Sequence, residues 1–196
     1  MNTLKSIAVF CASSDGEDEE IFHQAYHTGE YLAKNNINLI YGGSKLGLMG
    51  QVAKGALENN GKVTGVIPDF LKTKEVVHLG LTKLITTQNM HERKLKMHEL
   101  SDGFIALPGG FGTLEELFEI LTWGQLGLHK HPIGILNSSN YYDDLLKMMD
   151  NMVKKGLLRS SNMDLVLVAS TIEDLVEKMR NFKPIEVPTW MNKNQT

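Results

Sequence analysis

Apolar runs rich in Ile, Val and Leu alternate along the chain with segments whose apolar residues recur at helical spacing. Short continuous apolar runs are typical of strands buried on both faces, and the segments between them predict helices that cover those faces. The predicted strands are Ser6–Cys11, Asn38–Tyr41, Lys62–Ile67, Lys83–Thr86, Gly103–Leu107, Pro132–Leu136 and Leu165–Ala169. The predicted helices are Asp18–Lys34, Gly47–Asn59, Met90–Leu100, Thr113–Leu126, Tyr141–Lys155 and Ile172–Asn181.

Regular alternation of strands and helices predicts the α/β class, with a Rossmann-like parallel sheet and helices on both faces. A chain of 196 residues with 42% hydrophobic content is long enough for one well-buried core. We therefore expect a single domain over residues 1–185 and a polar tail over residues 186–196. In such sheets ligands bind beyond the carboxyl ends of the strands, so the turns after strands are the places to look for a site.

Charge and cysteine content narrow the possible partners. The net charge of -3 provides no general basic field for nucleic acid or anionic lipid, so any anion site must be built locally. Cys11 is the only cysteine, which excludes an intrachain disulfide, and we expect it to be a small buried apolar residue. With no signal-like or membrane-length apolar run, we expect a cytoplasmic protein.

Two glycine-rich turns follow predicted strands and precede predicted helices. One runs from Gly42 through Gly43 and Ser44 to Gly50, and the other comprises residues 108–113. Glycine lets an anion approach the backbone closely, and the helix that follows offers free N–H groups. The pair favours a phosphorylated ligand, with Ser13 after the first strand as a further donor, although glycines can also simply make tight turns. Neither the dinucleotide fingerprint nor the P-loop spacing occurs in the sequence.

Arg93 lies on an apolar helix stripe. Met90, Arg93, Met97 and Leu100 fall on one face of their predicted helix. A cation in the first turn also opposes the helix dipole. Both features point to a functional role, while the alternative is that Arg93 pairs with a nearby acid and packs its stem on the core.

Glu116 admits two interpretations. Thr113 and Glu116 have the spacing of a capping box, in which the glutamate serves only the helix start. Its helix also opens at the second glycine turn, where a carboxylate would lie near a bound phosphoribosyl group. Glu115 points about 100° away on the helix, so the two glutamates do not share one job.

Four histidines are considered as candidate metal ligands or catalytic residues, and the sequence supports neither role. His23 and His27 are four residues apart on the first helix, and without a third ligand we expect a solvated pair and no metal site. We interpret His129 and His131, in a loop before a strand, as surface residues.

Two motifs together resemble a known family. Residues 90–94, Met-His-Glu-Arg-Lys, and residues 108–116, Pro-Gly-Gly-Phe-Gly-Thr-Leu-Glu-Glu, are similar to the paired signature of the Lonely Guy proteins. These are cytokinin riboside 5′-monophosphate phosphoribohydrolases, which are often labelled lysine decarboxylases. The resemblance extends over nearly the whole chain to about Phe182, including the segment 122–127.

The resemblance implies an N-glycosidase that releases base and ribose 5-phosphate from a nucleoside monophosphate such as AMP. It implies that Arg93 and Glu116 are the catalytic pair. It further implies a homodimer whose helices complete each other's active sites, and no metal or organic cofactor. With the two glycine turns, the expected substrate contacts are Ser13, Gly43, Ser44, Glu75, Lys94, Gly109, Gly110, Phe111, Gly112, Thr113, Leu114, Glu115 and Thr122.

Two other functions remain open from the sequence. A non-catalytic nucleotide-binding or sensor protein would keep the glycine turns but would not need both Arg93 and Glu116. An amino-acid decarboxylase would need a pyridoxal-phosphate lysine in a recognisable setting, and we find none.

Overall fold

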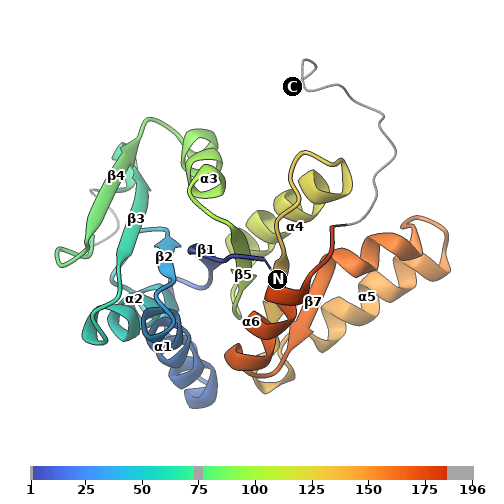
Figure 1. Ribbon diagram of the computed structural model, residues 1–196, viewed down its shortest axis with the longest axis horizontal. Coiled ribbons are helices and arrows are strands. Elements are labelled where there is room, and N and C mark those ends of the chain that lie inside the picture. Colours follow the sequence, from blue (N-terminus) through green and yellow to red (C-terminus); the bar gives the residue numbers. More distant parts are fainter. Residues whose placement is uncertain (1, 73–76, 185–196) are drawn as a thin grey trace.

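A seven-stranded parallel sheet forms the centre of the computed structural model, which describes residues 2–72 and 77–184 (Figure 1). The strand order is β4-β3-β2-β1-β5-β6-β7. The strands are β1 Ser6–Phe10, β2 Asn38–Tyr41, β3 Val63–Pro68, β4 Lys83–Thr87, β5 Gly103–Ala106, β6 Ile133–Leu136 and β7 Val166–Ala169. All of the predicted strands are present within one residue at either end, and the predicted fold class is confirmed.

The described residues form six α-helices, of which α6 follows the last strand and the others lie between strands. They are α1 Glu19–Lys34, α2 Gly47–Glu58, α3 Met90–Glu99, α4 Phe111–Gln125, α5 Asp143–Lys154 and α6 Ile172–Asn181. Helix α4 begins two residues before the prediction and α5 begins two residues after it. Three short 3-10 helices were not predicted, because so few residues carry no readable periodicity: η1 Asp69–Leu71, η2 Ser138–Asn140 and η3 Ser160–Leu165. Within the described ranges, no helix has the length and apolar content that a bilayer crossing requires.

Both faces of the sheet are covered, which explains the continuous apolar runs of the strands. In β1, Ile7 and Val9 pack in one core cluster with residues of α1, α2 and α6. Ala8 and Phe10 point the other way, into a second cluster with residues of α3, α4 and α5. Figure 1 shows α1, α2 and α6 on the side of the sheet opposite α3 and α4.

The strand order places a break in chain direction at the centre of the sheet. From β1 the chain moves outward through β2 and β3 to β4, and it then returns to the other side of β1 to form β5. The connections that leave β1 and β5 therefore diverge, and a crevice opens at their carboxyl ends. This is where the fold itself places a ligand.

Candidate active site

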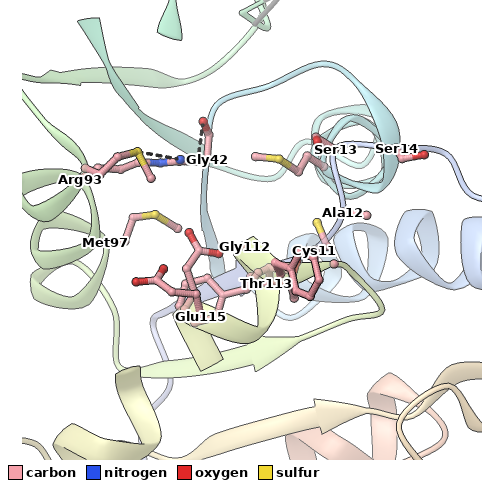
Figure 2. A pocket seen from close by; sticks show the side chains of 17 residues that line it. Cys11, Ala12, Ser13, Ser14, Gly42, Arg93, Met97, Gly112, Thr113 and Glu115 are labelled. Atoms are coloured by element: carbon pink, nitrogen blue, oxygen red, sulfur yellow. Dashed lines mark hydrogen bonds between the residues drawn. The ribbon is translucent and has the colours of Figure 1, made fainter. Parts of the chain in front are cut away.

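A cavity of about 410 Å³ lies at the carboxyl ends of β1 and β5 (Figure 2). Its size is within the range of small-molecule sites. It is lined by Val9, Phe10, Cys11, Ala12, Ser13, Ser14, Gly42, Met49, Met90, Arg93, Met97, Gly110, Phe111, Gly112, Thr113, Glu115 and Glu116. The residues come from the ends of β1 and β2 and from helices α2, α3 and α4, so the site depends on the whole central part of the sheet.

The glycine turn before α4 presents an uncapped helix start to this cavity. Gly110 is the N-cap residue, and no side chain binds the first amides of the helix. At Gly109 the turn packs closely against its neighbours. A Cβ there would lie 2.1 Å from the Thr113 hydroxyl and 3.0 Å from the Ala12 amide nitrogen, so only glycine fits at this position. Free amides and the positive end of the helix dipole make this turn suited to an anion.

The capping-box interpretation of Glu116 is wrong. Thr113 is the third residue of α4 and is buried, so it cannot be the N-cap. Glu116 instead lines the cavity as the sixth residue of α4. A glutamate does serve a helix start elsewhere: at α3, Asn89 accepts a hydrogen bond from the Glu92 amide at 2.9 Å, and the Glu92 carboxylate accepts one from the Gln88 amide.

Arg93 is held by backbone carbonyls rather than by an acid. Its side chain is 7% exposed. Its Nε donates to the Val66 carbonyl at 3.1 Å and its Nη2 to the Gly42 carbonyl at 3.4 Å. Among the residues that the structure describes, Arg93 forms no ion pair with a carboxylate. The guanidinium charge therefore remains available to a ligand or to Glu116.

Burial of Glu116 raises the pKa of its carboxyl group to about 7, and the nearby positive charge of Arg93 opposes that rise. A carboxyl group with such a pKa exchanges protons near neutral pH, which is the range that general acid–base catalysis needs. Its position in a cleft, together with this perturbation, is typical of catalytic carboxyl groups.

The predicted substrate contacts fall into two groups. Those that line the cavity, besides Arg93 and Glu116, are Ser13, Gly110, Phe111, Gly112, Thr113 and Glu115. Those that do not line it are Gly43, Ser44, Lys94, Gly109, Leu114 and Thr122. Glu75 lies outside the described residues.

Residues of the second group have other contacts. Gly43 has a φ of +81°, and the Ser44 hydroxyl accepts a hydrogen bond from the Leu46 amide at 3.1 Å, so both shape the turn after β2. The Thr122 hydroxyl donates to the Phe118 carbonyl of its own helix at 2.7 Å. Gly109 lies in the turn before α4 and lines a neighbouring hollow. Their direct contact with a substrate stays a prediction.

Sequence reasoning missed several cavity residues. Gly42 is one, since a Cβ there would lie 2.1 Å from Nη2 of Arg93, so glycine at this position makes room for the guanidinium. Met49, Met90 and Met97 supply apolar walls. The sequence indicated these residues only by their positions after a strand or on the same helix face as Arg93. Their side chains come from separate helices that the fold brings together.

The histidine interpretations are partly corrected. His129 is 8% exposed, and its Nε2 lies 2.9 Å from the Ile120 carbonyl oxygen. It packs on His131 and His98, so it is not a surface residue, because the loop folds back against β5 and α3. His27 contacts Glu30 and Glu173. Within the part of the chain described, no group of three or more metal-binding side chains has the geometry of a metal site.

Comparison with known proteins identifies the family. A profile described as "Possible lysine decarboxylase" matches residues 49–179. The cytokinin riboside 5′-monophosphate phosphoribohydrolase LOG5 of Arabidopsis thaliana is 41% identical over 182 residues, which are 93% of this chain and 80% of that protein. The chain belongs to the Lonely Guy family. Another Lonely Guy relative, the phosphoribohydrolase of Rhodococcoides fascians, is 42% identical over 91% of each chain.

Solved structures share the same fold at lower identity. The molybdenum cofactor carrier protein of Chlamydomonas reinhardtii matches 90% of this chain and 96% of its own, with a TM-score of 0.66 and 22% identity. The molybdenum cofactor binding protein of Rippkaea orientalis has the same score and identity and covers 90% of this chain and 94% of its own. At such identity these likenesses support the Rossmann-like architecture of the Lonely Guy chain and nothing about its ligand.

Proposed function

We propose that the chain hydrolyses the N-glycosidic bond of a nucleoside 5′-monophosphate, giving the free base and ribose 5-phosphate. The observation that carries this is the convergence of an uncapped helix start, Arg93 and Glu116 on one cavity. The names of the relatives, cytokinin riboside 5′-monophosphate phosphoribohydrolases, support the same reaction. The expected substrates are AMP and cytokinin riboside 5′-monophosphates.

The 5′-phosphate would bind at the uncapped start of α4, where residues 111–113 and Ser13 line the cavity. Its binding energy fixes the ribose and brings C1′ toward Glu116, which lies one turn further along α4. Arg93 can offer two parallel N–H groups to the substrate, a geometry that lysine cannot provide. The fold would therefore hold the ribose at its 5′-phosphate and orient it at C1′.

The chemistry would proceed through an oxocarbenium-like state at C1′. The C1′–N bond breaks and its electron pair leaves with the base, while the negative charge of Glu116 stabilises the positive charge on the ribose. A water molecule attacks C1′, and Glu116 accepts its proton as a general base. Water thus supplies the hydroxyl that stays on the ribose and the proton that ends on the base.

The test is release of base and ribose 5-phosphate from AMP by the purified protein, followed by chromatography. Glu116→Gln should bind AMP but lose turnover by about 10²-fold or more, while Arg93→Ala should weaken both. Undiminished adenine release by Glu116→Gln would refute the assignment. AMP binding without any release by the wild-type protein would favour a nucleotide sensor.

We infer that the Lonely Guy chain acts as a homodimer in the cytoplasm. Thr122, an expected substrate contact, lies outside the cavity of its own chain, which fits a site completed by a second copy. Phe111, which lines the cavity, is 94% exposed. A single buried free cysteine fits a reducing compartment.

A decarboxylase function has less support. The residues that line the cavity in the described structure include no lysine that could form a Schiff base. Lys94, which is closest in sequence to the catalytic pair, is engaged with Glu115 and Glu119.

A further inference from the structure

Lys94 joins two elements of the site without entering the cavity. It lies on α3 directly after Arg93, and its side chain is 10% exposed. Its Nζ lies 2.5 Å from the Glu115 carboxylate and 2.9 Å from the Glu119 carboxylate, both on α4. Successive helical residues point about 100° apart, so Arg93 can hold α3 to the ends of β2 and β3 while Lys94 holds it to α4.

Glu116 lies between the two carboxylates in sequence and faces the cavity between these helices. The charges that act on it are the positive Arg93 and Lys94 of α3 and the negative Glu115 and Glu119 of α4, with the buried thiol of Cys11 beside it. The two flanking carboxylates disfavour ionisation of Glu116. Lys94 both favours that ionisation and neutralises the pair.

We propose that Lys94 is a positioning residue that, through its ion pairs with Glu115 and Glu119, ties α4 to α3 and balances the two carboxylates that flank Glu116, rather than a direct contact for the substrate of its own chain. The inference rests on the proposed function, since it matters for the reaction only if Glu116 is the general base. Its physical content, the charge balance at Glu116, can be measured without any substrate.

The primary experiment is a pH titration of the Glu116 carboxyl group by carbon NMR in the ligand-free full-length protein. Lys94→Met removes a positive charge, so the Glu116 midpoint should move up by about one pH unit. Glu115→Gln removes a negative charge and should move it down. Lys94→Arg should stay close to wild type because the charge is kept.

A matched control comes from the same helix. Lys96 is 42% exposed and pairs only with Glu99 among the described residues, so Lys96→Met removes an equal charge away from the cavity. It should leave the Glu116 midpoint unchanged. The triple variant Lys94→Met, Glu115→Gln, Glu119→Gln should bring the midpoint back to or below the wild-type value, since the charges that Lys94 compensated are gone.

Activity provides the second readout. If AMP is hydrolysed, the acidic limb of the kcat/KM profile, which reports the free enzyme, should shift upward in Lys94→Met by the same amount as the NMR midpoint. An unchanged midpoint would overturn the proposal, whether it is accompanied by a raised KM, as for a direct substrate contact, or by lower stability alone. A shifted midpoint in a protein that hydrolyses no AMP would support the charge balance and refute the proposed function instead.

Discussion

At the scale of single residues, the site buries the Glu116 carboxyl group where its negative charge destabilises the folded protein. Burial raises the pKa of Glu116 to about 7, against an ordinary value of 4.5. Between pH 4.5 and about 7, the Glu116 carboxyl group is therefore more often protonated in the folded state than in the unfolded state. The folded state therefore loses stability as the pH rises through this window, and the loss persists above it.

Replacing Glu116 by Gln removes that cost. We expect Glu116→Gln to be more stable than the wild-type protein at pH 8, by on the order of 2 kcal/mol, because the amide carries no charge to bury. Near pH 4 the wild-type carboxyl group is mostly protonated in both states, so the two proteins should unfold alike. Urea denaturation of both proteins at the two pH values measures this difference.

The other titrating groups are common to both proteins, so the comparison isolates Glu116. An equal difference in the free energy of unfolding at both pH values would mean that packing, not charge, distinguishes the variant. It would also remove the evidence that the site sacrifices stability for a reactive carboxylate.

The role of Glu116 illustrates what residue patterns could and could not predict. The motif placed it correctly after a glycine turn, but the same letters also fitted a capping box. The structure separates the two because Gly110, not Thr113, is the N-cap of the helix. Glycine at an N-cap has no side chain to detect, so sequence reasoning could not locate this helix start within two residues.

At the scale of elements, most strands were predictable because they are apolar on both faces, and the helices because they are apolar on one; the edge strand β4 is mostly exposed. The partners of a buried polar side chain were not predictable. Arg93 could be recognised as misplaced, yet its contacts with Val66 and Gly42 come from strands far away in the sequence. Long-range hydrogen bonds of this kind follow from sheet order, which a local pattern does not contain.

Helices α1 and α2 pack with almost no space between their backbones. A Cβ at Gly29 would lie 1.9 Å from the Val52 carbonyl oxygen, and one at Gly55 would lie 2.0 Å from the Tyr26 carbonyl oxygen. Glycine on each helix thus allows the close approach, and both helices share the core on that face of the sheet. Because α2 follows the first glycine turn, this contact also supports the Gly42 side of the site.

We expect Gly29→Ala to destabilise the protein by about 1–3 kcal/mol, because forced separation of the helices outweighs the better helix propensity of alanine. Gly112→Ala is the matched control, since it is also a glycine-to-alanine change inside a helix and a Cβ there meets nothing within 4 Å. Thermal unfolding of both variants measures the contrast. Equal melting temperatures would show that α1 and α2 separate without cost.

At the scale of the whole molecule, the chain brings most but not all of its expected site together. The cavity gathers Arg93, Glu116 and the glycine turn, whereas Thr122 lies further along α4 and donates its hydroxyl to its own helix. In a homodimer, Thr122 could still contact a substrate if it lay at the cavity of the partner. Composite sites of that kind have a property that single-chain sites lack, since two defective chains can repair each other.

We expect such complementation between Glu116→Gln and Thr122→Val, provided that each variant alone is inactive. In a mixed dimer one site carries both defects and the other carries neither. Random pairing of equal amounts should then restore about a quarter of the wild-type adenine release. Each variant mixed with wild-type chain is the control for subunit exchange. If the mixture stays inactive although sedimentation shows mixed dimers, Thr122 acts within its own chain, and the separation seen between it and the cavity must be closed by movement of α4 instead.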